Sequence, residues 1–427
     1  MNFKDLDLNE GIIKAVEELG FTEATPIQAE AIPMILSGCD LRASAQTGTG
    51  KTAAFILPAL QKLSVAPTVK SQGPRILILV PTRELAMQVA AEAVKFSKHL
   101  ARVKTVCIYG GAPYPIQNRD LSRPFEILVA TPGRLIDHME RGRIDFSRLE
   151  MLILDEADRM LDMGFIEPVE QIAKATPKTR QTLMFSATLK GSVLELSNRL
   201  LTKPKEINVA HDMQKTENIE ERLLLVDNLN HKHRLLEELL VGPETNQTIV
   251  FTSTKRNADL LVDMLLDIGH RAAPLHGDMN QRQRSRTIES LRKGTVRVLV
   301  ATDVAARGID VLSITHVINF DLPQTAEDYV HRIGRTGRAG QTGIAISFAS
   351  QKETHLVRNI ERFTSRKLTV HTVPGMEPQA REQRPRESQF RNNGPRRTST
   401  SNQRPNNGPN KRSNAYSPAG SRPRSGY

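Results

Sequence analysis

The 427-residue chain is poor in cysteine: only Cys39 and Cys107 occur, far apart and outside any metal-ligand spacing. This scarcity argues against a disulfide framework and predicts a reducing compartment. The first residues contain neither the basic segment nor the apolar core of a signal peptide. No apolar run approaches the roughly 18 residues that a membrane helix requires. We therefore expect a soluble, cytoplasmic protein.

The chain also lacks an acidic excess: its formal net charge is +12, and the positive charge is concentrated at one end. Residues 373–427 contain ten arginines and one lysine against three glutamates, which gives +8 and leaves +4 for the rest. This segment is rich in Arg, Pro, Asn, Ser and Gly and poor in aliphatic residues, so we expect it to be disordered. It serves either as a solubilising tail or as a contact for nucleic-acid phosphates and bases, and we favour the second function.

Eight apolar runs of strand length alternate with helical patterns, in two sets. The first set covers residues 75–81, 125–132, 151–158 and 181–188, and the second covers 247–254, 296–303, 315–321 and 342–348. Continuously apolar runs indicate strands buried on both faces, and hence parallel sheets covered by helices. The sequence therefore predicts an α/β protein with domains at 1–208 and 221–372, a polar linker at 209–220 and the disordered tail at 373–427.

The stretch AQTGTGKT (45–52) ends in the Gly-Lys-Thr of a phosphate-binding loop, although Ala45 stands where the general pattern has glycine. A strand-like run precedes it and an amphipathic helical pattern follows. In this arrangement the backbone N–H groups and the helix N-terminus converge on the phosphates. We expect Gly48 and Gly50 to permit the tight backbone path, Lys51 to reach the β- and γ-phosphates, and Thr52 to bind Mg²⁺.

A pair of carboxylates, Asp155 and Glu156, follows another apolar run, MLIL. The end of a buried strand suits Asp155 to bind Mg²⁺ through its water shell and Glu156 to polarise the attacking water. An exposed acidic turn is the simpler alternative, but the four apolar residues before it argue against that. A GTPase would need an Asn/Thr-Lys-x-Asp motif to bind the base, and the sequence contains none.

The stretch HRIGRTGRAG (331–340) places Arg332, Arg335 and Arg338 at three-residue spacing. A solvated helix face is one explanation, but the intervening glycines disfavour a stable helix. We expect a loop that brings guanidinium groups to an anion. Arginine fingers contributed across an interface stabilise the charge of a transition state, so hydrolysis would need both domains.

These motifs resemble those of the DEAD-box RNA helicases of superfamily 2, and the resemblance runs from Phe3 to about Phe363. The matching stretches occur in the family's order: GFTEATPIQ (20–28), AQTGTGKT, PTRELA (81–86), Gly110–Gly111, TPGR (131–134), DEAD (155–158), SAT (186–188), IVFTST (249–254), QRQR (281–284), ATDVAARGID (301–310) and HRIGRTGR (331–338). Ala at the first loop position is usual in this family. The compact core and LILDEADRMLDMGF are similar to bacterial SrmB/RhlE-type members.

The resemblance implies two tandem RecA-like domains that use ATP and Mg²⁺. Gln28 would hydrogen-bond the adenine, Phe3 would stack on it, and Asp310 would hold the ribose. The implied nucleotide-binding residues are Phe3, Phe21, Thr25, Gln28, Ala45, Gln46, Thr47, Gly48, Thr49, Gly50, Lys51, Thr52 and Asp310, with Thr52 and Asp155 on the metal. The implied catalytic residues are Lys51, Asp155, Glu156, His331, Arg335 and Arg338.

The resemblance also implies RNA contacts from small, polar or glycine residues at strand ends, which suit phosphates and sugars rather than bases. The implied residues are Pro81, Thr82, Arg83, Gly111, Thr131, Arg134, Thr252, Gly277, Arg284 and Thr302. Ser186 and Thr188, hydrogen-bonding towards Asp158, would couple the nucleotide and RNA sites. RNA would thus bind largely without sequence preference to a core that we expect to be monomeric.

The expected activity is RNA-stimulated ATP hydrolysis in a two-state clamp, with a role in ribosome assembly or RNA turnover. ATP and single-stranded RNA would favour the closed state, which bends one RNA strand, and hydrolysis would reopen the cleft. A duplex-DNA translocase of the same superfamily is one alternative, although no extra domain is present to support it. A non-catalytic RNA-binding scaffold is the other, and the intact catalytic positions argue against it.

Overall fold

The chain folds into two parallel sheets, as predicted, because each apolar strand is buried between helices on both faces. The computed structural model describes residues 1–45, 48–67, 69–189, 191–208, 218–242, 245–306, 311, 313–337 and 341–379. Residues 1–379 form one unit. The candidate residues Gln46, Thr47, Asp310 and Arg338, most of the predicted linker and residues 380–427 of the predicted tail lie outside the described residues.

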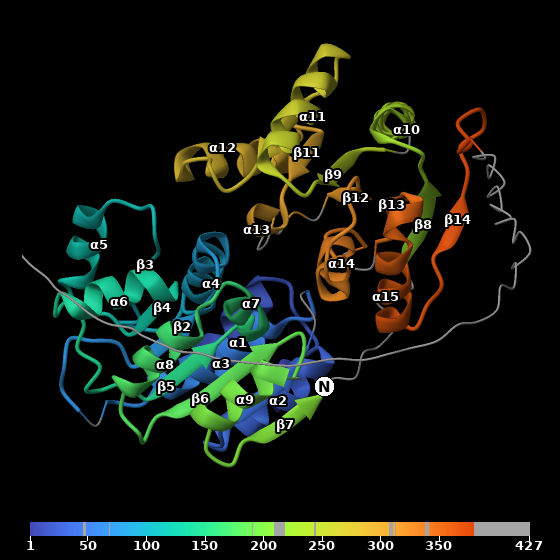
Figure 1. Cartoon of the computed structure of the whole chain (residues 1–427). Helices are drawn as coiled ribbons and strands as arrows, with labels where there is room; N and C mark the ends of the chain where they lie inside the picture. The colour runs from blue at the N-terminus through green and yellow to red at the C-terminus, as the bar shows by residue number, and fades with distance from the viewer. Residues whose placement is uncertain are drawn as a thin grey trace, which may run out of the picture. The chain divides into compact units, whose positions relative to one another are not determined.

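The first sheet belongs to the N-terminal lobe, which we define as the described residues up to 208 (Figure 1). Its strands are β1 (Leu41–Ser44), β2 (Ile76–Leu79), β3 (Thr105–Ile108), β4 (Ile127–Ala130), β5 (Met151–Leu154), β6 (Gln181–Ser186) and β7 (Lys205–Asn208). They pair in parallel in the spatial order β3-β4-β2-β5-β6-β1-β7.

The second sheet belongs to the C-terminal lobe, the described residues from 218 to 379. Its strands are β8 (Ile219–Leu225), β9 (Gln247–Phe251), β10 (Ala272–Leu275), β11 (Val298–Ala301), β12 (Ile314–Asn319), β13 (Gly343–Ala349) and β14 (Thr369–His371). They also pair in parallel, in the order β10-β11-β9-β12-β13-β8-β14. Counted from the first strand of each lobe, the two orders are identical, so the chain repeats one topology.

Helices connect successive strands. In the N-terminal lobe they are η1 (Phe3–Asp5), α1 (Glu10–Glu18), α2 (Pro26–Leu36), α3 (Lys51–Leu63), α4 (Arg83–Phe96), α5 (Tyr114–Leu121), α6 (Pro132–Glu140), α7 (Ala157–Asp162), α8 (Ile166–Lys174) and α9 (Gly191–Leu200). In the C-terminal lobe they are α10 (Leu229–Val241), α11 (Lys255–Asp267), α12 (Gln281–Arg292), α13 (Asp303–Ala306), α14 (Ala326–Ile333), η3 (Gln351–Glu353) and α15 (Thr354–Thr364). None of these described helices is long and apolar enough to cross a bilayer.

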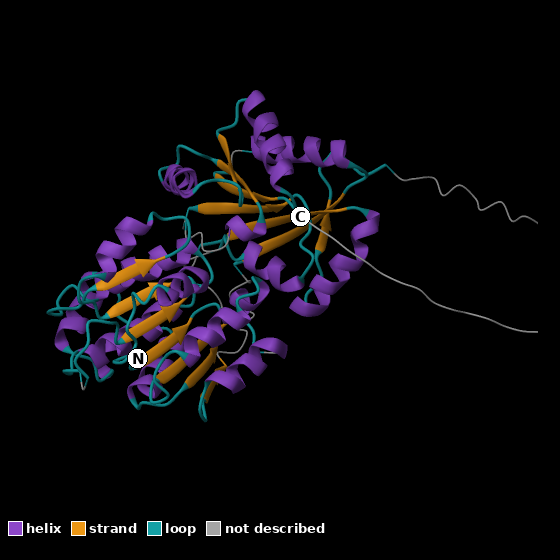
Figure 2. Ribbon diagram, turned by 60° about the vertical axis from the view of Figure 1, so that its left-hand side comes forward, coloured by secondary structure: helices purple, strands orange, loops and turns teal. Residues whose placement is uncertain are grey.

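Each sheet is a middle layer between helices (Figure 2). Alternate residues of β2 show this directly: Ile76 and Ile78 pack in a core with α1 to α4, whereas Leu77 and Leu79 pack in a second core with α5 to α9. The period-2 geometry of a strand sends successive side chains to opposite faces. The central strands therefore need apolar residues throughout, and their carboxyl ends form one edge of the sheet.

The boundary of the predicted tail requires a correction. Val373 and Met376, which composition assigns to the disordered segment, pack against the core of the C-terminal lobe. The carbonyl oxygen of Met376 lies 2.9 Å from Nε2 of His231, and the N–H of Gln379 donates to Asp227 at 2.9 Å. Composition cannot detect these contacts because their partners lie roughly 150 residues earlier in the chain.

Candidate active site

The phosphate-binding loop lies between β1 and α3, at the carboxyl edge of the first sheet. Gly48 and Gly50 have φ of 83° and 92°, the left-handed region that favours glycine. A Cβ atom on Gly50 would also collide with Nε2 of Gln28. Ala45 is 3% exposed, and its N–H donates to the carbonyl of Ser186 at 2.9 Å. The loop is thus anchored at its first residue and turned by its two glycines.

Thr25 and Gln28 hold this loop from α2. Thr25 Oγ1 donates to the carbonyl of Thr49 at 2.8 Å, and Gln28 Nε2 donates to the carbonyl of Gly50 at 3.0 Å. Gln28 Oε1 accepts from the N–H of Thr25, so the side chain is nearly buried and largely engaged with protein. The amide keeps one Nε2 hydrogen for a ligand. Gln28 therefore connects the predicted adenine site to the phosphate loop.

The two aromatic candidates for adenine stacking differ in exposure. Phe3 is 4% exposed and belongs to the core of the N-terminal lobe. Phe21 is 49% exposed, and its ring centroid lies 6.4 Å from that of Phe96. Only Phe21 presents a substantial part of its ring to solvent. The sequence prediction that Phe3 stacks on the base therefore does not match its position.

Lys51 and Asp155 are buried at the same sheet edge. Lys51 is 6% exposed, and its Nζ has no hydrogen-bond partner among the described residues. Asp155 is 3% exposed, and burial raises the pKa of its carboxyl group to about 6, although Lys51 acts in the opposite direction. An unpaired buried ammonium is costly, so a phosphate group fits this position. A bound cation would likewise offset the free-energy cost of burying the ionised Asp155 carboxylate.

These residues fit a magnesium ion that is coordinated by the protein and by the nucleotide phosphates together. The described residues contain no group of three or more His, Cys, Asp or Glu side chains able to enclose a metal. Mg²⁺ typically takes one or two protein ligands and completes its shell with phosphates and water. Thr52 and Asp155 would hold the ion, which when bound neutralises charge on the phosphates.

Glu156 has a strained backbone. It caps the N-terminus of α7 with φ 54° and ψ 51°, a left-handed conformation that is unusual for a residue with a side chain. Its N–H donates to Asp155 Oδ1 at 3.0 Å. Non-glycine residues in this region cost of order 1–3 kcal/mol and concentrate at functional sites. This backbone places the two carboxylates in succession between β5 and α7.

Three of the predicted coupling and catalytic residues line one cavity of about 830 Å³. Asp158 and Thr188 from the N-terminal lobe line it together with His331 from α14. Asp158 Oδ1 and His331 Nδ1 are buried without a partner within the described part of the chain. Ser186 is fully buried, and its Oγ accepts from the N–H of Thr188 at 3.3 Å. The structure brings these residues together, although no hydrogen bond joins Thr188 to Asp158 among the residues that it describes.

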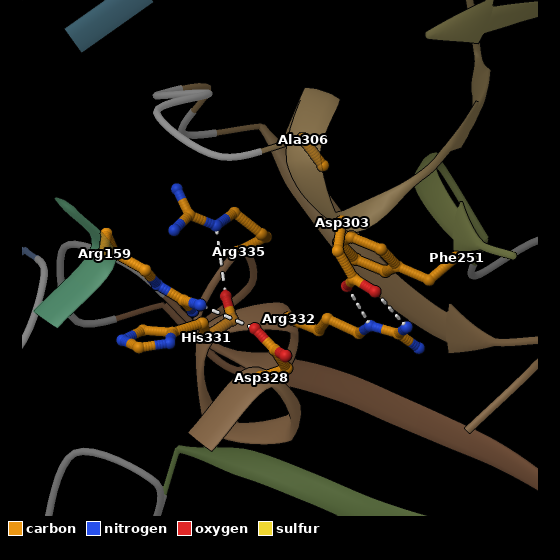
Figure 3. Close-up of a pocket in the computed structure, with 8 residues that line it drawn as sticks. All are labelled: Arg159, Phe251, Asp303, Ala306, Asp328, His331, Arg332 and Arg335. Carbon is orange, nitrogen blue, oxygen red and sulfur yellow. Dashed lines mark hydrogen bonds and ion pairs between the residues drawn. The ribbon is translucent and has the colours of Figure 1, made fainter. Parts of the chain in front are cut away.

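The prediction of a loop is wrong for Arg332, which lies in the last turn of α14, and the arginines have different roles (Figure 3). Arg332 is 2% exposed and forms a two-point ion pair with Asp303, at 2.5 and 2.7 Å. Arg335 and Arg332 both line a small pocket of about 10 Å³, and Nε of Arg335 donates to the carbonyl of His331 at 3.1 Å. Arg332 is therefore a structural residue of the C-terminal lobe. Arg335 stays a candidate finger.

The candidate RNA residues of the N-terminal lobe follow β2, β3 and β4, at the edge that carries the phosphate loop. Thr82 caps α4 by accepting from the N–H of Leu85. Gly111 has φ 85°, and any side chain there would collide with the guanidinium of Arg83. Arg134 lies 4.1 Å from the ring centroid of Tyr114. Pro81 and Thr131 occupy corresponding strand ends. Parallel α/β sheets bind ligands at this edge.

The candidate RNA residues of the C-terminal lobe divide into two groups. Gly277 and Thr302 keep exposed surface. Thr252 is fully buried, and its hydroxyl donates to Asp321 at 2.8 Å. Arg284 is 7% exposed and pairs with Glu84 of the N-terminal lobe at 2.9 Å. The side chains of Thr252 and Arg284 are therefore engaged with protein, and the role of these two residues as RNA contacts stays a prediction.

Sequence reasoning missed the partners of these charged residues. Glu84, Arg159 and Asp328 form ion pairs between the lobes, and Asp303 fixes Arg332. Glu84 lies within PTRELA, and Arg159 follows DEAD directly, so both adjoin recognised motifs. Their ion-pair partners lie 169 and 200 residues away, which a single sequence does not reveal.

Comparison with known proteins agrees with this geometry. Residues 25–196 match the DEAD/DEAH box helicase family, and residues 230–340 match the helicase conserved C-terminal domain. The chain is 44% identical over 375 residues to the DEAD-box ATP-dependent RNA helicase CshA of Bacillus cereus, covering 88% of this chain and 70% of the relative. It is 43% identical to the ATP-dependent RNA helicase DeaD of Mycobacterium tuberculosis, covering 88% of this chain and 65% of the relative.

A solved structure of an RNA-bound protein has a similar fold. Saccharomyces cerevisiae Dbp5 bound to RNA and ADP BeF3 matches with a TM-score of 0.78 and 30% identity, covering 87% of this chain and 95% of the other. The narrower likeness to SrmB/RhlE-type members stays a prediction, since the bacterial relatives carry the names CshA and DeaD. The two matched domains and the extent of the identity establish that this chain belongs to the family of DEAD-box ATP-dependent RNA helicases.

Proposed function

We propose that this protein hydrolyses ATP when RNA is bound, and that this cycle locally opens RNA duplexes or remodels RNA–protein complexes. The main support is the buried Nζ of Lys51, which has no hydrogen-bond partner in the part of the chain that the structure describes, and which interacts with the charge of the buried Asp155 carboxylate. A phosphate chain with its metal ion would satisfy both groups at once. The N–H groups at the start of α3 supply further donors for the same phosphates.

Each residue has a specific task in this proposal. Lys51 and Thr52 bind and orient the phosphates, and Asp155 holds the metal. Glu156, fixed by its left-handed backbone, accepts a proton from the attacking water and orients it. Arg335, with Arg338 from the segment outside the described residues, stabilises charge that develops on the transferred phosphoryl group. Because Arg335 and Glu156 belong to different lobes, hydrolysis depends on both.

RNA binding would occur along the carboxyl edges of the sheets. Arg83 and Arg134 in the N-terminal lobe, and Gly277 in the C-terminal lobe, offer guanidinium and backbone groups, whereas the Thr82 and Thr131 side chains are nearly buried. Contacts of this kind bind phosphates and sugars, so we expect little sequence preference and a preference for RNA through its 2′-hydroxyl groups. ATP and RNA would both favour the closed state of the lobes, and phosphate release would reopen it.

Phosphate release in the presence of RNA or DNA tests this function. The wild-type protein is expected to hydrolyse ATP at least about tenfold faster with single-stranded RNA than without it, and DNA of the same sequence should give little stimulation. Lys51→Ala should lose ATP binding and turnover. A wild-type protein without RNA stimulation would support the scaffold alternative, and equal stimulation by DNA would support the translocase alternative.

A role in ribosome assembly or RNA turnover, in the cytoplasm, is part of the same proposal. Two free cysteines, Cys39 and Cys107, agree with a reducing compartment. Crosslinking in cells, followed by sequencing of the bound RNA, tests the role. Recovery of ribosomal precursors or decay intermediates would support it, whereas enrichment of unrelated RNA classes would contradict it.

A further inference from the structure

An ion pair joins the helix after the DEAD motif to the helix that carries the arginine loop. Nη1 of Arg159, on α7, donates to Oδ1 of Asp328, on α14, at 2.6 Å (Figure 3). Both side chains are shielded, with exposed fractions of 4% and 18%. Shielding weakens the screening by water that makes most surface ion pairs ineffective. The contact therefore carries more energy than an ordinary surface pair.

The electrostatic surroundings of Arg159 support a strong contact. Burial lowers the pKa of its guanidinium, but the hydrogen bond and charge of Asp328, together with the charges of Asp158 and Glu156, hold the pKa above its ordinary value. Arg159 has a second partner on its own helix, Asp162, at 3.2 Å, whose side chain is 52% exposed. Arg159 thus keeps one carboxylate whether or not Asp328 is in place, which lowers the cost of separating the lobes.

The pair is close to the proposed chemistry on both sides. Arg159 lies three residues, less than one helical turn, after Glu156. Asp328 lies in the first turn of α14, three residues before His331, whose carbonyl accepts from Arg335. The helix α14 is itself fixed to its sheet, because Arg332 binds Asp303 and donates to Asn319 at 3.1 Å. Movement at Asp328 is therefore transmitted to Arg335.

We propose that Arg159 and Asp328 are positioning residues that align Arg335 with the phosphate site when the lobes close. This inference rests on the proposed function and adds a specific cross-lobe contact to it. The pocket beside the pair has a volume of about 10 Å³, near the lower limit for one water molecule, so little solvent separates these groups. Without the pair, α14 would lose its direct ionic link to α7 and Arg335 would be less often in place.

A double-mutant cycle with Arg159→Gln and Asp328→Asn in the full chain tests this assignment. Each single substitution is expected to lower kcat for RNA-stimulated hydrolysis about 10- to 100-fold, and the double variant should lose no more than about threefold beyond either single one. The affinity for fluorescent ADP should stay within about twofold of wild type, because the nucleotide binds the N-terminal lobe. Losses that multiply in the double variant, or an unchanged kcat, would overturn the proposal.

A second measurement does not depend on hydrolysis. The affinity for labelled single-stranded RNA is measured with and without AMP-PNP, and the gain caused by AMP-PNP should shrink about tenfold in each variant while the nucleotide-free affinity is unchanged. Equal gains in all variants would contradict a positioning role even if the protein were not an ATPase. Arg199→Gln serves as the matched control, since Arg199 forms a 2.6 Å ion pair with Glu170 inside the N-terminal lobe. It should leave both readouts unchanged.

Discussion

The ammonium of Lys232 lies 3.0 Å from a carboxylate oxygen of Asp321 in the C-terminal lobe. In the repeated topology these residues correspond to Lys51 and Asp155: each lysine lies in the first turn of the helix after the first strand, and each aspartate follows the fifth strand. Only three residues separate β8 from α10, whereas six separate β1 from α3. The second loop is too short to enclose phosphates, and its lysine is already neutralised. We therefore expect one nucleotide site per chain.

Lys232→Met should therefore destabilise the C-terminal lobe without changing nucleotide binding. Burial raises the pKa of Asp321, but Lys232, Ser253 and Thr252 outweigh burial and hold this pKa below its usual range. Removing the ammonium leaves a buried charge, and we expect a loss of about 3 kcal/mol. Urea unfolding measures the loss, and titration with fluorescent ADP should give one site per chain in both proteins. A changed stoichiometry would refute the assignment of a single site.

Gly50→Ala should weaken ATP binding at least about tenfold. The added methyl group would collide with Gln28 and would also force a side chain into the left-handed region at φ 92°. Gly38→Ala is a matched control, since Gly38 has φ 84° but open space around its Cβ position. Calorimetric titration with ATP should separate the two, and equal weakening in both variants would show that backbone strain alone is responsible.

Glu156→Gly should be up to about 1 kcal/mol more stable than Glu156→Ala, although both should be inactive. Glycine relieves the left-handed backbone at φ 54°, and alanine does not. Lys203, at φ 46°, provides the comparison outside the site. Lys203→Gly should gain a similar stability over Lys203→Ala and keep full ATPase activity. Chemical denaturation checks the stabilities, and an unstable Glu156→Gly protein would mean that the turn does not store strain.

Deleting residues 380–427 should lower RNA affinity, mostly at low salt, and leave the RNA-stimulated ATPase intact, because the deleted segment is rich in arginine and contains none of the candidate catalytic residues. Deleting 373–427 should in addition destabilise the C-terminal lobe by about 2 kcal/mol, because Val373 and Met376 would no longer cover its core. RNA binding at several salt concentrations and thermal unfolding test these two effects. Equal stability of the two deletions would contradict the corrected boundary.

Features set by local pattern were predictable from the sequence. All eight apolar runs contain strands, and α3 begins at Lys51 because the left-handed Gly50 ends the loop there. The carboxyl edge was also predictable, since parallel strands bring Lys51 and Asp155 to one side of a sheet. Each of these residues follows a strand-length run closely in the sequence, so its position at the sheet edge depends on local pattern.

Features set by distant partners were not predictable. Spacing alone makes Arg332 and Arg335 equivalent, and only the fold shows that Asp303 neutralises Arg332. Thr252 is a small polar residue after a strand, as expected of an RNA contact. Its hydroxyl, however, donates a hydrogen bond to Asp321, 69 residues later. Burial and pairing therefore decide the role of a polar residue that follows a strand.

In the proposed mechanism Glu156 activates water in a site completed by both lobes. The most direct test is phosphate release by Glu156→Gln with saturating ATP and single-stranded RNA, measured beside the binding of both ligands. We predict that this protein binds ATP and RNA as tightly as wild type but releases phosphate at least about 100-fold more slowly. Phosphate release at the wild-type rate would contradict this account.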